Sequence, residues 1–210
     1  VGSLRYLVHT RPDLAYSVGY VRRFLQRPTT EHEQAVKRIV HYVAGTLDHD
    51  LYYPRCPGEA HLVGYSDSDH AGDIDTSKSI SGILFFLDKC HISWQSIKQQ
   101  VVAMSSCEAE YIAASTASTQ LLWLATLLGD LLGRDTAAME LSVVDSQSAL
   151  ALAKNPVFHE RSKHIQVRYH FIRDCLAEGS IKARYINTKD QLANLLTKHL
   201  GRIKFLELCS

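Results

Sequence analysis

The stretch His61–Gly72 reads His-Leu-Val-Gly-Tyr-Ser-Asp-Ser-Asp-His-Ala-Gly, and the rest of the chain is best interpreted outward from it. Leu62, Val63 and Tyr65 predict a short strand, which breaks into Ser, Asp and Gly, so Asp67 falls at the strand's end. A carboxylate there is held by a rigid scaffold and still reaches solvent. Because a Ser-Asp cluster is also typical of an ordinary turn, the role of Asp67 depends on its partners.

Composition narrows the class of protein. The chain has 210 residues, 46% of them hydrophobic, which is enough for one large domain or one domain with a smaller unit. Its 23 Lys and Arg against 22 Asp and Glu give a formal charge of +1, so any contact with nucleic acid must come from local basic patches. We find no 18-residue apolar run and no leader, and we expect a soluble fragment of a longer protein without membrane contact.

The cysteines predict neither a zinc site nor a disulfide framework. Five are present, they are widely spaced, and no two form a Cys-x-x-Cys pair. This pattern fits a reducing compartment.

Two units are expected along the chain. Residues 1–57 carry apolar side chains at helical spacing, with Pro12 in the first turn of one helix and Thr29 as the cap of another. Pro54, Pro57 and Gly58 then interrupt both helix and strand, which marks a boundary. We therefore expect a small helical segment over residues 1–57 and an α/β domain over residues 58–210.

The second unit alternates strands and helices. Ser105-Ser106-Cys107-Glu108 is a capping-box pattern that begins a long helix. Strands are predicted at 61–67, 81–87, 91–95, 141–144 and 181–186, and helices at 106–132, 146–154, 163–178 and 189–200.

Acidic residues recur at the ends of these elements. Asp145 follows a strand in the same way as Asp67, and neighbouring strands would place the two carboxylates side by side. On the long helix, Glu108 and Glu110 are about 200° apart, so only one of them can meet the sheet. Glu110 shares the small, apolar stripe and Glu108 suits the cap, so Glu110 is the expected third acid.

Three clustered carboxylates repel each other unless a divalent cation neutralises them. Oxygen ligands suit Mg²⁺ or Mn²⁺ rather than zinc. Two such ions about 4 Å apart can hold a water nucleophile and the leaving oxygen of a phosphodiester.

The acidic residues and the motifs around them give this sequence a resemblance to a known family. Residues 61–200 resemble a ribonuclease H domain, and the whole chain resembles the C-terminal end of the Pol polyprotein of copia-type LTR retrotransposons. The resemblance rests on Ser3-Leu4-Arg5-Tyr6-Leu7, Arg11-Pro12-Asp13, Tyr65-Ser66-Asp67-Ser68-Asp69, Ala71-Gly72-Asp73, Ser79-Ile80-Ser81-Gly82, Ile92-Ser93-Trp94, Ser105-Ser106-Cys107-Glu108-Ala109-Glu110-Tyr111, Asp145-Ser146-Gln147-Ser148-Ala149, Ser162-Lys163-His164-Ile165 and Arg168-Tyr169-His170.

The resemblance implies an α/β fold with a ribonuclease H-like mixed five-stranded sheet flanked by helices. It implies that residues 1–57 are the reverse transcriptase tail, its thumb or connection, and that Asp67, Glu110 and Asp145 are metal-binding acids. The family's fourth acid is replaced here by Asn194, whose neutral carbonyl oxygen should bind the second Mg²⁺ or Mn²⁺ more weakly. Asp190, one helical turn earlier, is a candidate to compensate.

A basic region precedes the last strand. Its side chains either follow the phosphate backbone of an RNA/DNA hybrid or form a solvated helix face. Its members are Arg161, Lys163, His164, Arg168, His170 and Arg173.

The expected function is hydrolysis of the RNA strand of RNA/DNA hybrids, in partnership with the remainder of the reverse transcriptase. The Tyr-x-Asp-Asp polymerase motif is absent, so the chain should not polymerise. The alternative is a catalytically impaired, nucleic-acid-binding or structural remnant, which Asn194 favours; an integrase or transposase ranks last. The expected location is cytoplasmic, in the element's virus-like particle, or else nuclear.

Overall fold

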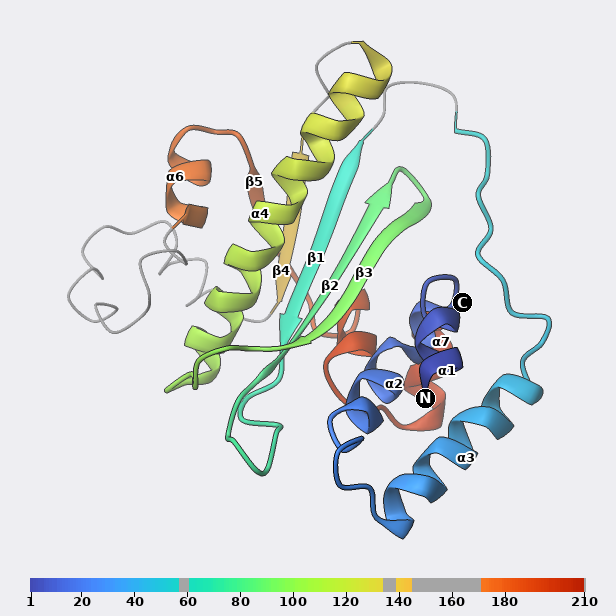
Figure 1. Cartoon of the computed structure of the whole chain (residues 1–210). Helices are drawn as coiled ribbons and strands as arrows, with labels where there is room; N and C mark the ends of the chain where they lie inside the picture. Colours follow the sequence, from blue (N-terminus) through green and yellow to red (C-terminus); the bar gives the residue numbers. More distant parts are fainter. Residues whose placement is uncertain (57–60, 134–138, 145–170, 210) are drawn as a thin grey trace.

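A mixed five-stranded sheet lies at the centre of the chain (Figure 1). The computed structural model describes residues 1–56, 61–133, 139–144 and 171–209. The strand order is β3-β2-β1-β4-β5; β1, β2 and β3 pair antiparallel, whereas β4 is parallel to β1 and β5 to β4. The strands are β1 Leu62–Ser68, β2 Ile80–Leu87, β3 Cys90–Lys98, β4 Met139–Val144 and β5 Lys182–Ile186. The predicted α/β fold class, with a ribonuclease H-like mixed sheet of five strands, is confirmed.

Strand β2 is apolar from Ile83 to Leu87 because both faces of the sheet are covered there. Ile83 and Phe85 belong to one buried cluster, under the long helix, and Leu84 and Phe86 to another, on the opposite face. Alternation along a strand sends successive side chains to opposite faces, so a continuous apolar run marks a strand that is buried on both.

Helix α4 (Ser106–Leu132) covers the first face together with α6 (Phe171–Ala177). It begins as the capping pattern predicts, since the Ser105 side chain accepts a hydrogen bond from the Glu108 amide at 3.2 Å. It ends at Gly133, whose φ of 63° is the left-handed conformation that favours glycine. Of the described helices, α4 alone is long and apolar enough to cross a membrane, but its Ala and Ile side chains pack against the sheet.

The N-terminal helices cover the second face of the sheet. They are α1 (Gly2–Leu7), the 3₁₀ turn η1 (Pro12–Leu14), α2 (Ala15–Arg22) and α3 (Thr30–Ala44). Ala15 joins the cluster of Leu84 and Phe86, and the Trp94 indole donates a hydrogen bond to the Val8 carbonyl at 2.8 Å. In Figure 1 both chain ends lie beside this layer. The segment predicted as a separate helical unit is therefore packed on the sheet through α2 and Val8, whereas α3 packs on α2.

The C-terminal region differs from the prediction. A single helix was expected over 189–200, whereas the structure has a short 3₁₀ helix, η4 (Leu192–Leu196), and a further helix, α7 (Arg202–Cys209), that was missed. The Gln191 side chain accepts a hydrogen bond from the Ala193 amide and so starts a tight turn at that point. Strand β3 is longer than expected, reaching Lys98, and the helix predicted over 146–154 lies outside the described residues.

Candidate functional site

Asp67 lies at the end of β1 and is buried, with 2% of its surface exposed. The Thr197 hydroxyl donates a hydrogen bond to its Oδ2 atom at 2.5 Å, and the Lys198 ammonium lies 3.9 Å from the same oxygen. Hydrogen bonds to an ionised acceptor are among the stronger ones in proteins. The carboxylate is therefore held in one orientation by a residue far along the chain.

Glu110 faces Asp67 from helix α4, and it is 7% exposed. Its Oε1 atom accepts a hydrogen bond from the Ser68 amide at 3.3 Å. Glu108 points elsewhere, since its Oε2 atom accepts from the Met104 amide at 3.0 Å. The two glutamates thus separate as the helical geometry requires, and the one that meets the sheet end is Glu110.

The buried carboxylate of Asp67 changes the ionisation of Glu110. Burial, and after it the charge of Asp67, raises the pKa of Glu110 to about 9. The Ser68 amide and the Lys198 ammonium act in the opposite direction but do not compensate. Without a cation, the pair therefore retains one proton at neutral pH.

Asn194 occupies the far side of this arrangement, in η4. It is 3% exposed, and its Nδ2 group donates to the Thr188 carbonyl at 3.1 Å. Thr197 connects the Asn194 backbone to Asp67, because the Thr197 hydroxyl also lies 3.3 Å from the Asn194 backbone carbonyl oxygen. Asp190, by contrast, is exposed in the turn before η4.

Two of the predicted ligand residues each have one side-chain oxygen without a hydrogen-bond donor among the described residues. These oxygens are Glu110 Oε2 and Asn194 Oδ1, and both are buried. Buried polar atoms are nearly always paired, so these unpaired oxygens require an explanation. Hard cations bind carboxylate and amide oxygens of this kind.

Gly82 allows η4 to approach the acids. It pairs with Asp67 across the two strands, and a Cβ atom on it would lie 2.6 Å from the Ala193 carbonyl oxygen and 2.7 Å from Thr197 Cγ2. Sequence reasoning missed both Gly82 and Thr197. The available signal was an isolated glycine inside a strand, which often marks a close approach of another backbone.

A buried amide network fixes the surrounding backbone. The Gln99 Nε2 group lies within 3.1 Å of Ser68 Oγ, Ser81 Oγ and the Ala109 carbonyl oxygen. The Gln191 Nε2 group donates to the Ser66 carbonyl at 3.1 Å. These bonds tie the end of β1 to β2, to α4 and to the segment that begins η4.

The third predicted acid, Asp145, lies outside the described residues. The strand before it is described: β4 runs parallel to β1 with Val143 opposite Ser66. Accordingly, no group of three or more His, Cys, Asp or Glu side chains that could hold a metal ion occurs within the described ranges.

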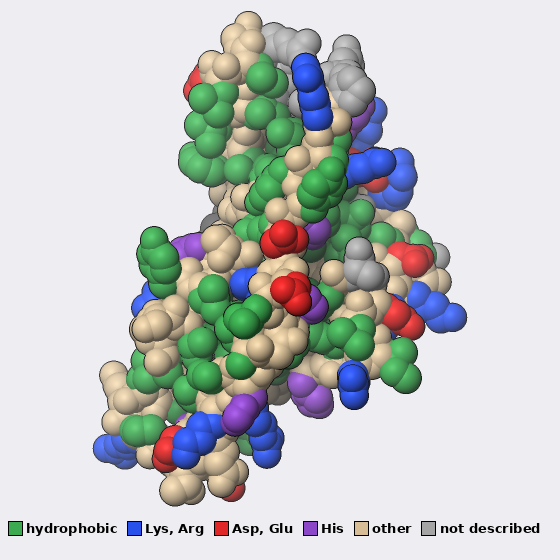
Figure 2. Space-filling model, turned by 90° about the vertical axis from the view of Figure 1, so that its right-hand side faces the viewer, with side chains coloured by type: hydrophobic (Ala, Val, Ile, Leu, Met, Phe, Trp, Pro, Cys, Tyr) green, Lys and Arg blue, Asp and Glu red, His purple; other side chains and the backbone are tan. Residues whose placement is uncertain are grey.

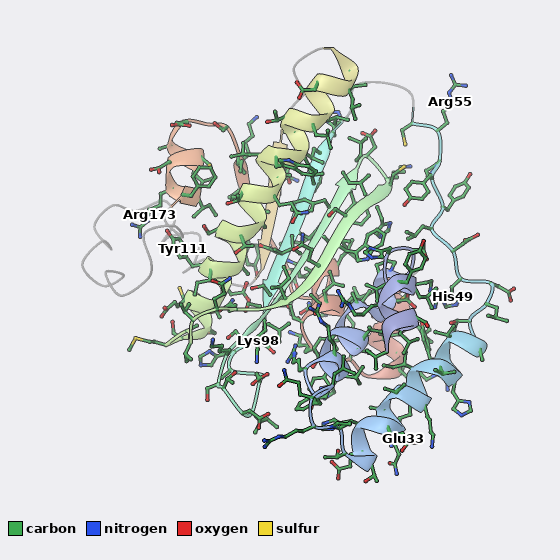
Figure 3. The ribbon with its side chains drawn as sticks, in the orientation of Figure 1. Glu33, His49, Arg55, Lys98, Tyr111 and Arg173 are labelled. Carbon is green, nitrogen blue, oxygen red and sulfur yellow. The ribbon has the colours of Figure 1, made fainter. Side chains whose placement is uncertain are left out.

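Most of the predicted nucleic-acid-binding residues also lie outside the described part of the chain. These are Arg161, Lys163, His164, Arg168 and His170. Arg173 is described, and its guanidinium lies over the Tyr111 ring, 5.6 Å from the centroid (Figure 3). On the face shown in Figure 2, Lys and Arg side chains occur in several separate groups between hydrophobic patches, as the small net charge suggests.

Comparisons with known proteins give the family. No family model matches the chain. It is 46% identical over 211 residues to the retrovirus-related Pol polyprotein from transposon TNT 1-94 of Nicotiana tabacum, covering 100% of this chain and 15% of the polyprotein. It is 42% identical over 205 residues to that from transposon RE2 of Arabidopsis thaliana, covering 98% of this chain and 14% of the polyprotein.

Among solved structures, LC11-RNase H1, isolated from compost, is similar with a TM-score of 0.45 and 16% identity, over 65% of this chain and 92% of that one. The identity over the full length of this chain decides the assignment, although the chain spans only about 14% of the relatives' length. The chain belongs to the family of copia-type retrotransposon Pol polyproteins.

Proposed function

We propose that this chain is the ribonuclease H part of a retrotransposon reverse transcriptase and hydrolyses the RNA strand of RNA/DNA hybrids with two divalent cations, Mg²⁺ or Mn²⁺. The observation that carries the proposal is the buried pair of Asp67 and Glu110, with Glu110 Oε2 and Asn194 Oδ1 left without described donors. Burying two acids together is costly, and a fold that serves only stability has no reason to do so.

The residues present fit such cations. Asp67, Glu110 and Asp145 would supply carboxylate oxygens, and Asn194 an amide oxygen, with Asp190 as a more distant candidate. When bound, the cations supply an activated water and stabilise the leaving oxygen of the phosphodiester. No thiol or imidazole is needed, which agrees with Mg²⁺ or Mn²⁺ rather than zinc.

The protein's own residues prepare the site for this chemistry. The Thr197 hydroxyl fixes one oxygen of Asp67, and the Ser68 amide fixes one oxygen of Glu110, so each acid keeps one oxygen for a ligand. Because Glu110 has a pKa of about 9 without a cation, binding must displace its proton. Cation affinity should therefore increase with pH up to that value.

The proposed substrate is bound by shape and phosphate contacts rather than by reading bases. We place Arg161, Lys163, His164, Arg168, His170 and Arg173 in this role. The proposed partner is the remainder of the reverse transcriptase, to which residues 1–57 would form the tail, and the proposed setting is the element's cytoplasmic particle or the nucleus.

The test is cleavage of an end-labelled RNA strand in three forms: paired with DNA, paired with RNA, and single-stranded. With Mg²⁺ or Mn²⁺, we expect cleavage of the hybrid alone. Asp67→Asn should lower the rate by at least about 100-fold, because an essential ligand is lost. Glu33→Gln, an acid-to-amide change on the exposed face of α3 (Figure 3), is the matched control and should leave the rate unchanged.

A second candidate function is hybrid binding without hydrolysis, and Asn194 is the observation that favours it. Its side chain is already engaged with Thr188 through Nδ2, so only a neutral oxygen remains for a ligand. Asn194→Asp separates the candidates. A gain in cleavage by Asn194→Asp supports an enzyme that is weakened by the amide at position 194. Hybrid binding without cleavage in both the wild type and Asn194→Asp would refute the ribonuclease proposal.

A further inference from the structure

Two thiols meet at one carbonyl, away from the acids. The Cys56 thiol donates a hydrogen bond to the Pro54 carbonyl oxygen with an S···O distance of 3.6 Å, and the Cys90 thiol donates to the same oxygen at 3.7 Å. The Cys56 thiol is also close enough to Cys90 to raise its pKa. Both cysteines are partly exposed and neither is in a disulfide. Two thiols that reach the same carbonyl oxygen and are within reach of solvent are arranged for oxidation to a disulfide.

We propose that Cys56 and Cys90 form a reversible thiol-modification site that closes into a disulfide when a peroxide oxidises it. One thiol is oxidised to a sulfenic acid, with the peroxide reduced to water. The second thiol then attacks that sulfur, an S–S bond forms, the S–O bond breaks, and a second water leaves. A dithiol reverses the step by exchange, taking the two protons and electrons to the protein and becoming a disulfide itself.

The cross-link would join two parts of the structure that are otherwise loosely connected. Residues 50–56 form no backbone hydrogen bond with any other described residue, and Tyr52 and Tyr53 are exposed. Cys90 begins β3, at the turn of the β2–β3 hairpin. A disulfide would therefore attach the extended connection between the helical segment and the sheet to a rigid hairpin.

The same connection forms one wall of a cavity. Leu51 and Tyr52 line a space of about 550 Å³ together with Leu84 and Phe86 of the sheet. Fixing Cys56 to the hairpin would hold this wall in place. The site does not depend on the acids at the end of β1, so its test is independent of the ribonuclease proposal.

The other cysteines provide controls. Cys175 is buried in the cluster under α4, whereas Cys107, at the start of α4, is partly exposed like Cys56 and Cys90. Cys107→Ser is therefore the matched control for Cys56→Ser and Cys90→Ser. Burial and the neighbouring Cys56 thiol raise the pKa of Cys90, which predicts faster oxidation at alkaline pH.

The experiment treats the full chain with one equivalent of hydrogen peroxide and maps disulfides by mass spectrometry. Trypsin cuts after Arg55, Lys78, Lys89 and Lys98, so the expected product joins peptide 56–78 to peptide 90–98. We expect the melting temperature to rise by roughly 5–10 °C, because the unfolded chain is constrained, and to return to its original value with dithiothreitol.

Cys56→Ser and Cys90→Ser should each remove both the cross-linked peptide and the rise in melting temperature, while Cys107→Ser should retain both. Several results would overturn the inference: a disulfide between other cysteines, a disulfide between two molecules, or oxidation of either thiol beyond the sulfenic acid without a cross-link.

Discussion

Gly82→Ala should displace η4 from the site. The added Cβ would lie 2.6 Å from the Ala193 carbonyl oxygen, 2.7 Å from Thr197 Cγ2 and 2.9 Å from Leu196 Cβ. Because non-bonded heavy atoms are most favourable at about 3.5–4.0 Å, η4 must retreat by about 1 Å. The Ala193 carbonyl oxygen and Leu196 Cβ are fixed by the backbone of η4, so a rotamer change of Thr197 alone cannot relieve the conflict.

The expected loss of unfolding free energy in Gly82→Ala has two parts. Overpacking of a close-fitting site costs about 1–3 kcal/mol of unfolding free energy. The retreat also stretches the 2.5 Å bond from Thr197 to Asp67, and a hydrogen bond to a charged group contributes about 1.5–3 kcal/mol. We therefore expect a total loss of about 2.5–6 kcal/mol, or a melting temperature lower by roughly 5–24 °C.

Urea denaturation of four proteins tests this reasoning. They are the wild type, Gly82→Ala, Thr197→Val and the double variant. If displacement of η4 already breaks the Thr197 bond, Thr197→Val should cost much less in the Gly82→Ala background than alone. Gly19→Ala is the matched control, since a Cβ there meets nothing closer than 3.8 Å in helix α2, and it should stabilise the chain by about 0.5–1 kcal/mol. Wild-type stability in Gly82→Ala, or full additivity with Thr197→Val, would refute the argument.

Two further predictions concern buried charge. The folded-state pKa of Glu110, about 9, lies above its unfolded value, so its stabilising contribution is complete below pH 4.5 and is lost as pH rises towards 9. In EDTA, the urea midpoint should therefore fall between pH 5 and pH 8.5 by more in the wild type than in Glu110→Gln. Equal falls in the two proteins would contradict the assignment. Arg11 forms a bidentate pair with Asp13. Arg11→Met, which leaves that largely buried carboxylate without a cation and with only the Tyr42 hydroxyl as a side-chain donor, should cost about 3 kcal/mol by urea denaturation. Lys37→Met, which breaks the exposed pair with Glu33, should have no measurable effect.

The local sequence pattern was sufficient to predict the first strand of the sheet and the long helix that packs on it. The strand ending at Asp67 and the long helix follow from spacing and capping alone. The same geometry separated Glu110 from Glu108, because two positions along a helix face opposite sides. The residues that determine the strand, the helix and the separation of the two glutamates lie within a few positions of each feature.

The other features of the fold and the site depend on contacts between residues that are far apart in the sequence. Thr197 meets Asp67 across 130 positions of sequence. The N-terminal apolar stripes indicated burial but not that the sheet would cover them. In η4, leucines at helical spacing predicted a regular helix, and the side chain of Gln191 produced a tight turn instead. Cys56 and Cys90 likewise became a pair only through folding.

Asn194 affects stability and cation binding in opposite directions. The Thr197 hydroxyl links the Asn194 backbone carbonyl oxygen to the buried Asp67 carboxylate, so an aspartate at this position would add a further negative charge near a pair that already retains a proton. The amide removes that repulsion and so stabilises the fold without cations, but it also removes a charged ligand. Asn194→Asp should therefore be less stable than the wild type in EDTA and gain more stability from Mg²⁺, because the cation then neutralises a larger charge. Equal stabilisation of the two proteins by Mg²⁺ would place Asn194 outside the cation site, whatever the cleavage assay shows.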